Sequence, residues 1–294
     1  MASPQNRSIG YRVFRFFNAL ILLLLAALCL FPLVHILAVS LSSQAAASAN
    51  QVFLWPVNFT FASYKVVAGR SEYWRAFWVS VQRVALGVSI NTVLTVLMAY
   101  PLSKPVAEFK ARRYYVWMLI FVMIFNGGLV PTYLVVKDLG LINSLLALVL
   151  PGAVPIYNVI LTMNFMRQLP KEIEEAAFID GASYFQSFYQ VVLPLSKPVI
   201  ATIVLFSFLS HWNAWFDGII YISESTKYPL QTYMYNVIAN RDLTNSSEAI
   251  ENALSNVKTM KSAQLFLTML PILAIYPFLQ KYFTKGITIG AVKG

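Results

Sequence analysis

The sequence predicts an all-α integral membrane protein with six transmembrane helices. Of the 294 residues, 58% are hydrophobic and only 12% are charged, a composition that excludes one or two ordinary soluble domains. Several apolar runs reach the length of about 20 residues that is needed to cross about 30 Å of hydrocarbon. Helices satisfy their own backbone groups in lipid, so we expect each run to be a helix. The runs are Phe17–Leu41, Phe77–Leu102, Tyr115–Val136, Ile142–Met166, Val199–Tyr221 and Ala263–Phe283.

The first run resembles a signal peptide, because three arginines precede it and Ala47-Ser48-Ala49 imitates a cleavage site. Its apolar stretch is much longer than the usual signal-peptide core of about 7–15 residues. We therefore expect a retained anchor that follows a short basic tail of residues 1–16. The single cysteine, Cys29, lies within this run and is expected to pack there without a disulfide.

Lysine and arginine set the predicted orientation, since they gather on the cytoplasmic side of bacterial membrane proteins. With the N-terminus inside, thirteen of the 22 basic residues fall in cytoplasmic segments and eight fall outside. The last one, Arg83, lies near the outer end of the second span, where it is expected to snorkel. Most of the +10 net charge is thus explained by membrane topology and does not indicate a nucleic-acid site. Both termini are expected in the cytoplasm, at a bacterial inner membrane.

The third and fourth spans contain residues that interrupt helices. Asn126-Gly127-Gly128 lies in the third, and Pro151-Gly152 and Pro155 lie in the fourth. Such breaks free backbone groups, which is tolerated where they face other helices or a water-filled cavity. The breaks could serve only to kink helices for packing. Because two successive spans are interrupted, we favour a role that faces a lumen.

The fifth span contains His211-Trp212-Asn213-Ala214-Trp215-Phe216-Asp217, and Asp217 is the only acidic residue within a span. A carboxylate in a membrane segment indicates a functional site by default. Trp212, Trp215 and Phe216 recur at helical spacing, and sugars bind on aromatic faces beside polar groups. The alternative is an interfacial aromatic belt with a snorkelling or paired acid. The candidate substrate-path residues are Asn126, Tyr157, Asn158, His211, Trp212, Asn213, Trp215 and Asp217.

A polar island, Glu174–Pro194, separates the fourth and fifth spans on the cytoplasmic side. Small and apolar residues recur there at intervals of three and four, which predicts a short helix. Gly181 then permits a turn with positive φ, and Ser183–Val192 predicts a second amphipathic helix that Leu193–Pro194 would end. An ordinary interfacial loop is the alternative. We expect a helix–turn–helix on the inner face of the membrane, with aromatic residues available to a partner.

Motifs for catalysis and metal binding are missing. The sequence has no phosphate-binding GxxxxGK[ST] loop, no G-x-S-x-G and no HExxH. Two histidines and one cysteine cannot form a metal cluster of ordinary spacing. We therefore expect a transport subunit that is not an enzyme and holds no cofactor. If ATP drives the process, another chain must hydrolyse it.

The island carries a resemblance to a known family. Glu175-Ala176-Ala177, then Gly181, Val191 and Leu193-Pro194, resemble the EAA signature of ABC-importer permeases, with Val in place of the usual Ile. Further similarity covers nearly the whole chain, in segments such as Ala99–Lys104, Gly127–Tyr133, Leu139–Asn143, His211–Asp217, Tyr228–Gln231 and Tyr282–Ile287. The pattern is that of the maltose-type carbohydrate-uptake group, in its branch for complex oligo- and polysaccharides, and looks most like the second permease subunit of alginate oligosaccharide importers.

The resemblance implies a type I importer fold, in which residues 17–286 form the permease domain and residues 287–294 a cytoplasmic tail. It implies a sister permease, two cytoplasmic subunits that bind ATP and Mg²⁺, and an extracytoplasmic binding protein that would contact the outer loop 222–261. A coupling loop, 167–197, would transmit ATPase closure. The coupling residues implied are Glu174, Glu175, Ala176, Ala177, Asp180, Gly181, Leu193 and Pro194, and Glu174 and Glu175 are expected as partner contacts.

Two points stay open at this stage. Where the family usually has Asn-Ser near the start of the second span, this chain has Val79-Ser80-Val81-Gln82-Arg83, so Arg83 could contact an acidic substrate or only snorkel. An ion-coupled secondary sugar carrier or channel without an ATPase is the alternative function. It should show ionisable residues along its path, and Asp217 and Arg83 are the two candidates.

Overall fold

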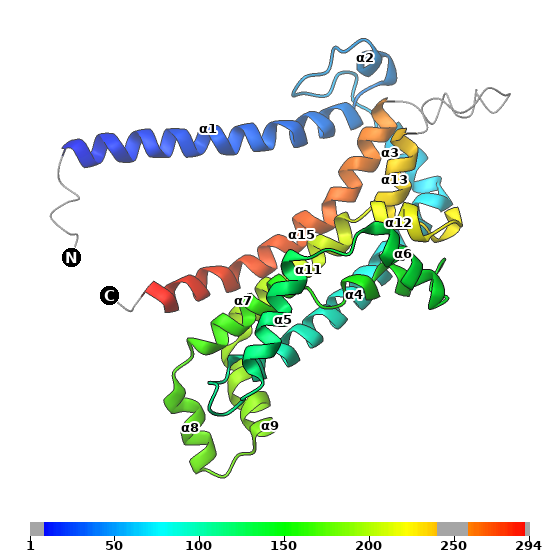
Figure 1. Cartoon of the computed structure of the whole chain (residues 1–294). Helices are drawn as coiled ribbons and strands as arrows, with labels where there is room; N and C mark the ends of the chain where they lie inside the picture. Colours follow the sequence, from blue (N-terminus) through cyan, green and yellow to red (C-terminus); the bar gives the residue numbers. More distant parts are fainter. Residues whose placement is uncertain (1–8, 240–257, 292–294) are drawn as a thin grey trace. The chain divides into compact units, whose positions relative to one another are not determined.

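The computed structural model describes residues 9–239 and 258–291, and every regular element in these ranges is a helix (Figure 1). The predicted all-α class is therefore confirmed for the described part of the chain. Predictions for residues 1–8, 240–257 and 292–294 lie outside it. They concern the first half of the basic N-terminal tail, the middle of the outer loop and the end of the C-terminal tail.

The chain divides into two compact units. The first comprises Met1–Ser71 and Ile238–Leu270, and the second comprises Glu72–Val237 and Pro271–Gly294. Among the described residues, the first unit holds α1 (Ile9–Ser40), α2 (Gln44–Ser48), α3 (Ala62–Gly69) and the start of α15 (Lys258–Ala291). A small core of Ala38, Val39, Ala46, Ala47 and Val52 joins the end of α1 to α2.

Cys29 corrects one expectation about the first unit. Its side chain is exposed on α1 and does not pack against the chain. The reason is that the side chains of α1 become buried only in its last turns, at Ala38, Val39 and Ser40. A long apolar surface that its own chain leaves uncovered is expected of a helix that faces lipid or another subunit.

Two described helices, α1 and α4 (Ser71–Ser103), are each long and apolar enough to cross a membrane. Three bent pairs pass the same test together, which gives up to 5 spans in the described residues. The pairs are α5 (Arg112–Ile124) with α6 (Leu129–Asp138), bent by 112°, Leu145–Gly152 with α7 (Ile156–Arg167), bent by 48°, and Tyr184–Leu195 with α11 (Lys197–Asn213), bent by 76°. The predicted sixth span lies within α15 and stays a prediction.

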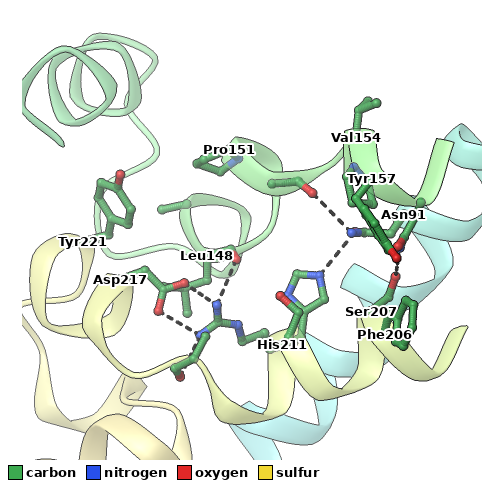
Figure 2. Close-up of a pocket in the computed structure, with 17 residues that line it drawn as sticks. Asn91, Leu148, Pro151, Val154, Tyr157, Phe206, Ser207, His211, Asp217 and Tyr221 are labelled. Carbon is green, nitrogen blue, oxygen red and sulfur yellow. Dashed lines mark hydrogen bonds and ion pairs between the residues drawn. The ribbon is translucent and has the colours of Figure 1, made fainter. Parts of the chain in front are cut away.

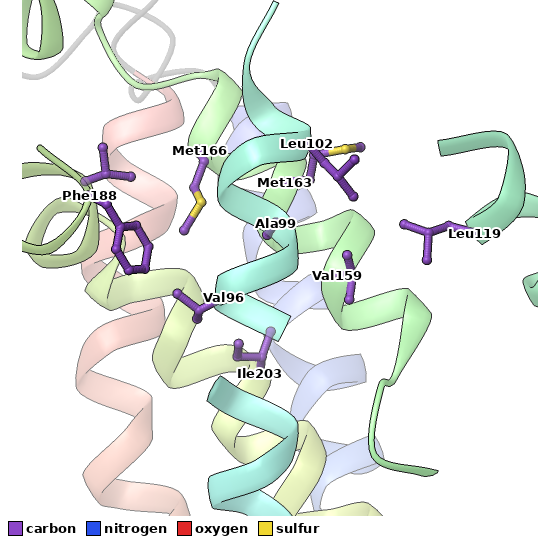
Figure 3. Close-up of a cluster of buried hydrophobic side chains, with 10 residues drawn as sticks. Val96, Ala99, Leu102, Leu119, Val159, Met163, Met166, Phe188 and Ile203 are labelled. Atoms are coloured by element: carbon purple, nitrogen blue, oxygen red, sulfur yellow. The ribbon is translucent and has the colours of Figure 1, made fainter. Parts of the chain in front are cut away.

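The core of the second unit lies between α4, α7 and α11 (Figure 3). Val96, Ala99 and Leu102 of α4 face Val159, Met163 and Met166 of α7, and Ile203 of α11 and Phe188 close the cluster. Each helix contributes residues spaced by three or four, which is the period that places side chains on one helical face. This core holds α4, α7 and α11 together.

The outer side of the second unit contains more helix than expected. The predicted loop 222–261 begins with a 3₁₀ turn, η5 (Ser225–Lys227), and continues as α13 (Leu230–Ala239). Leu230 is fully buried, and its backbone N–H donates to Oγ of Ser80 on α4 at 2.7 Å. The expectation of a plain polar loop is therefore wrong for residues 230–239, whose apolar face packs inward.

Candidate functional site

The inner hairpin, Lys171–Leu195, is the first candidate site. It consists of α8 (Lys171–Ile179), α9 (Tyr184–Ser187), a π-helical turn η4 (Phe188–Val192) and α10 (Leu193–Leu195). Helices α8 and α9 lie side by side, joined by a short turn (Figure 1). The predicted helix–turn–helix is present.

Gly181 makes the turn, as the sequence predicts. Its φ is +83°, in the left-handed region that glycine adopts without strain. Its N–H donates to the carbonyl of Phe178 at 3.0 Å, and the N–H of Ala182 donates to the carbonyl of Ala177 at 2.9 Å. These two bonds form a Schellman motif, the common way to end a helix at a glycine.

The second helix of the hairpin begins with a capping box that our sequence reasoning missed. Oγ of Ser183 accepts from the N–H of Gln186 at 3.3 Å, and the Gln186 side chain accepts from the N–H of Ser183 at 2.8 Å. The Ser-x-x-Gln spacing is the sequence signal for this motif. The capping box and Gly181 together fix the short connection between α8 and α9.

The second helix of the hairpin ends within one residue of Pro194, close to the predicted end. Helical structure runs to Leu195, and the chain bends at Ser196 before α11 begins. The π-helical turn Phe188–Val192 precedes the proline and changes the local hydrogen-bond spacing.

Glu174 holds the hairpin against the end of α4. Its Oε1 pairs with Nζ of Lys104 and accepts hydrogen bonds from the hydroxyls of Tyr100 at 2.9 Å and Ser187 at 3.1 Å. Nζ of Lys104 also lies 4.5 Å from the centroid of the Tyr100 ring. Burial acts to raise the pKa of Glu174, but these three donors together outweigh it and the pKa is lowered. We call this group of four residues the Glu174 clamp.

The clamp corrects the expectation that both adjacent acids are partner contacts. The side chain of Glu174 is only 22% exposed and is engaged within its own chain, whereas Glu175 is exposed. Of the other predicted coupling residues, Ala176, Asp180 and Pro194 are exposed, and Ala177 and Leu193 are half-buried. Large apolar or aromatic side chains stand exposed around the hairpin at Ile173, Ile179, Tyr184, Phe185 and Tyr189.

The second candidate site is a cavity of about 740 Å³ among α4, the turns η2 (Leu145–Leu148) and η3 (Leu150–Gly152), α7, α11 and α12 (Phe216–Tyr221). We call it the Arg83 cavity. In Figure 2, Asp217 and Leu148 lie at one end, and His211, Asn91 and Ser207 lie at the other. Its volume falls within the range of known small-molecule sites, about 300–1,000 Å³.

Side chains of α4 compensate the breaks in the neighbouring spans. Arg83 donates to the carbonyls of Leu148 and Ala214, each at 3.3 Å, and Nδ2 of Asn91 donates to the carbonyl of Gly152 at 3.2 Å. Backbone groups freed by a broken membrane helix need such partners. The breaks at Pro151-Gly152 therefore face a cavity, as expected, and the polar residues of α4 make them stable.

Arg83 does not snorkel to the membrane surface. Its side chain is 2% exposed and forms a two-pronged pair with Asp217, in which Nη1 lies 3.1 Å from Oδ1 and Nη2 contacts Oδ2. The partner is 134 residues away in the sequence, so local pattern could not reveal it. Among the outcomes that we considered for Asp217, the paired acid is the one observed.

Four of the eight predicted path residues line the cavity, namely Tyr157, Asn158, His211 and Asp217. His211 packs against Gly87, where a Cβ atom would collide with the imidazole ring, and its Nε2 lies 3.2 Å from Oδ1 of Asn91. Nδ2 of Asn158 donates to Oγ of Ser207 at 3.4 Å. These contacts place amide, hydroxyl and imidazole groups around one space.

The other four predicted path residues lie elsewhere. Asn126 is exposed and accepts from the N–H of Gly128 at 2.9 Å, so the third-span break does not border the cavity. Trp212 is 2% exposed and packs between Phe77 and Phe208. Asn213 is exposed at the end of α11. Trp215 stacks on Tyr235, with ring centroids 4.4 Å apart.

The aromatic residues of the fifth span separate because that span is broken. Helix α11 ends at Asn213 and α12 begins at Phe216, so Trp212, Trp215 and Phe216 do not share one helical face. The carbonyl of Trp215 accepts from Oγ1 of Thr232 at 2.9 Å. No proline or glycine precedes this break, and sequence reasoning therefore missed it.

Sequence reasoning also missed Asn91 as a cavity residue. A signal was present, because Arg83, Gly87, Asn91 and Thr95 recur every four residues along an otherwise apolar span. Such spacing places side chains on one face of a helix, and all four are buried in α4. A polar stripe on a membrane helix faces the protein interior, where it can meet other polar groups.

Comparison with known proteins identifies the class. Residues 86–289 match the model of a family described as the binding-protein-dependent transport system inner membrane component, and the chain belongs to this family. Membership makes it a membrane transport component and not an enzyme. It also implies association with a binding protein and an ATPase, and it does not favour an ion-coupled carrier.

Individual relatives cover nearly the whole chain. Protein LplC of Bacillus subtilis (strain 168) is 42% identical over 99% of this chain and 98% of its own length. The polygalacturonan/rhamnogalacturonan transport system permease protein YtcP of the same organism is 35% identical over 95% of this chain and 99% of its own length. A solved chain of a bacterial ABC transporter involved in the import of the acidic polysaccharide alginate is 33% identical, with a TM-score of 0.85, and the match covers 94% of this chain and 98% of that one.

Proposed function

We propose that the chain is one of two different permease subunits in an ATP-driven importer of oligosaccharides, at the bacterial inner membrane. Three similar proteins act on saccharides: the polygalacturonan/rhamnogalacturonan permease YtcP, the alginate importer, and a melibiose/raffinose/stachyose import permease, MelC of Bacillus subtilis (strain 168), that is 29% identical. The substrate class rests on these relatives, and the mechanism rests on the inner hairpin.

The inner hairpin is the observation that carries the mechanism. Ile179, Tyr184, Phe185 and Tyr189 are large, apolar or aromatic, and exposed at one end of the second unit. An amphipathic helical element with such residues typically enters a groove of a partner. We assign this surface to a cytoplasmic ATP-binding subunit, with Glu175, Ala176 and Asp180 beside it. ATP and Mg²⁺ would be held by that subunit and not by this chain.

The Glu174 clamp would connect the hairpin to the substrate path. When the ATP-binding subunits close, they move the hairpin, and the bonds from Glu174 to Tyr100 and Lys104 carry that movement into α4. The same helix bears Arg83 and Asn91 in the wall of the cavity. Closure at the hairpin would thus change the cavity through one continuous helix, which is the requirement for alternating access.

The proposed topology has six spans and both termini in the cytoplasm. Residues 1–16 and 287–294 form the cytoplasmic tails, residues 17–286 form the permease domain, and the last tail contacts the ATPase interface. The outer segment 222–261, which includes α13, is proposed to contact the extracytoplasmic binding protein. The excess of lysine and arginine in the inner segments supports this orientation.

Purification of the chain from native membranes tests the proposal. We expect a second permease and an ATP-binding subunit to co-purify, and we expect the eluate to hydrolyse ATP faster when a saccharide-loaded binding protein is added. Replacement of Phe185 with glutamate should release the ATP-binding subunit. Tyr114→Glu, at another exposed aromatic residue outside the hairpin, is the control and should retain it. A chain that purifies alone, without ATPase activity, would refute the assignment.

A further inference from the structure

Arg83 is the single lysine or arginine among the described residues that border the cavity, so it is the obvious group to bind an acidic sugar. Its bonds argue against that role. Nη1 donates to Asp217 and to the carbonyl of Ala214, and Nη2 donates to Asp217 and to the carbonyl of Leu148. Both terminal nitrogens are therefore engaged. Only Nε, which is buried, lacks an acceptor in the described chain, and one N–H cannot offer a carboxylate the usual two-pronged contact.

Asp217 is engaged to the same degree. Besides the pair with Arg83, its Oδ1 accepts from the N–H of Gly218 at 2.8 Å. Among the described residues, the lining contains no other aspartate, glutamate, lysine or arginine, so the formal charges of this part of the cavity wall cancel. A substrate carboxylate could reach the guanidinium only by displacing Asp217, whose side chain is 27% exposed, and this would leave a half-buried carboxylate without its partner. Such a rearrangement is unfavourable.

The other described residues that line the cavity are polar or aromatic in several places and carry no formal charge. Tyr157 is 60% exposed, and its ring centroid lies 6.2 Å from that of Phe206. Asn158 makes only one long side-chain bond, to Ser207, and Ser210 also lines the space. An aromatic face can pack against the apolar face of a sugar ring, and the neighbouring amides and hydroxyls can form hydrogen bonds with the hydroxyl groups of the sugar. Figure 2 shows Tyr157, Asn91 and Ser207 gathered at the same end of the cavity.

We propose that the Arg83 cavity is a saccharide subsite. It binds the hydroxyl groups and ring faces of the sugar and does not recognise the charge of the substrate. The Arg83–Asp217 pair is a cross-link that joins α4, the η2–η3 turn and the α11–α12 break, and it thereby shapes the wall. The inference rests on the proposed function, and it assigns the selection of acidic over neutral substrates to another component of the importer.

The first test uses paired substitutions in the complete importer, reconstituted in proteoliposomes with saturating binding protein. The probes are trigalacturonate and its carboxyl-reduced derivative, which have equal length and linkage and differ in charge. R83Q and D217N should each lower the uptake of both probes by about tenfold, because the first leaves a half-buried carboxylate and the second a buried guanidinium without its charged partner. R83Q/D217N should recover uptake to within about threefold of the wild type, with an unchanged ratio between the probes.

The second test concerns the aromatic wall and does not depend on the buried pair. Y157A should lower the uptake of both probes by about tenfold while the complex still assembles, since Tyr157 is largely exposed. Y114A changes a tyrosine that is 78% exposed and lies outside the cavity, and it should have no effect.

The outcomes separate the inference from the proposed function. A wild-type importer that takes up neither probe in an ATP-dependent manner would refute the function. With an active wild type, selective loss of trigalacturonate uptake in R83Q/D217N would overturn the inference, because Arg83 would then bind the substrate carboxylate. Failure of the double variant to recover would also overturn it, as would a Y157A variant with normal uptake. If the binding protein accepts only one probe, recovery of that probe decides the first test.

Discussion

Ser187 of α9 donates a hydrogen bond from its hydroxyl to Glu174 of α8 at 3.1 Å, and this bond closes the inner hairpin across its own turn. Tyr100 and Lys104 donate to the same carboxylate oxygen from the end of α4. One half-buried acceptor therefore joins three segments. A hydrogen bond to a charged group contributes about 1.5–3 kcal/mol, so the loss of this charge should be measurable.

Glu174→Gln should uncouple import from ATP hydrolysis. The amide keeps the size of the side chain but removes the charge that faces Lys104, and we expect the number of saccharides imported per ATP to fall by about tenfold. The measurement is uptake divided by ATPase rate in proteoliposomes. Glu175→Gln, one residue away on the exposed face, is the matched control and should retain the wild-type ratio. Equal ratios in both variants would contradict the clamp.

The clamp should also be sensitive to pH. The pKa of Glu174 is lowered from 4.5 in the folded protein, so its stabilisation is fully present above pH 4.5 and is lost as the pH falls through the folded pKa. The difference in melting temperature between the wild type and Glu174→Gln should therefore stay constant from pH 7 to about pH 5 and shrink at lower pH. A difference that grows on acidification would show the opposite shift in pKa.

Gly181→Val should impair coupling through backbone strain alone. The φ of +83° costs a residue with a Cβ atom about 1–2 kcal/mol, and the space around a Cβ atom at this position is open. We expect the complex to insert and assemble while import per ATP falls. Gly181→Asn, which tolerates the left-handed region better, should retain more activity. Full transport by the valine variant would rule out a strained hinge.

Gly87→Ala should destabilise the cavity wall, because the new methyl group would collide with the ring of His211. Overpacking of this kind typically costs about 1–3 kcal/mol. The melting temperature of the purified complex measures it, with Gly69→Ala as a control at a position that has free space. In a His211→Ala background the cost of Gly87→Ala should largely disappear. Two additive losses would indicate that the collision is relieved in another way.

The sequence predicted those parts of the structure that depend on local chemistry. Gly181 marks its own turn because glycine alone accepts a positive φ without cost, and the Pro and Gly residues near 151–155 mark a real break. The break after Asn213 has no such residue. It is stabilised by Arg83 and Thr232, which donate to the freed carbonyls of Ala214 and Trp215 from distant segments.

The contrast between local chemistry and contacts with distant segments also explains why only four of the eight predicted path residues line the cavity. His211 and Asp217 line the cavity as expected, because ionisable groups in a span need polar surroundings. Trp212 was placed on the path by helical spacing alone, and tertiary packing against Phe77 and Phe208 decided its position instead. Glu174 and Glu175 are adjacent and chemically alike, so only the fold distinguishes the clamp from the exposed residue.

Helix α4 carries both sites on one uninterrupted rod. Arg83 and Tyr100 are 17 positions apart, which corresponds to about 25 Å at 1.5 Å per residue. The number of intervening residues also fixes the angle between the two side chains about the helix axis. A single residue inserted between them would rotate Tyr100 by about 100° relative to Arg83, so the hairpin contact and the cavity wall would no longer face their partners together. The number of residues between Arg83 and Tyr100 is therefore constrained in its own right, independently of the side chains on this segment.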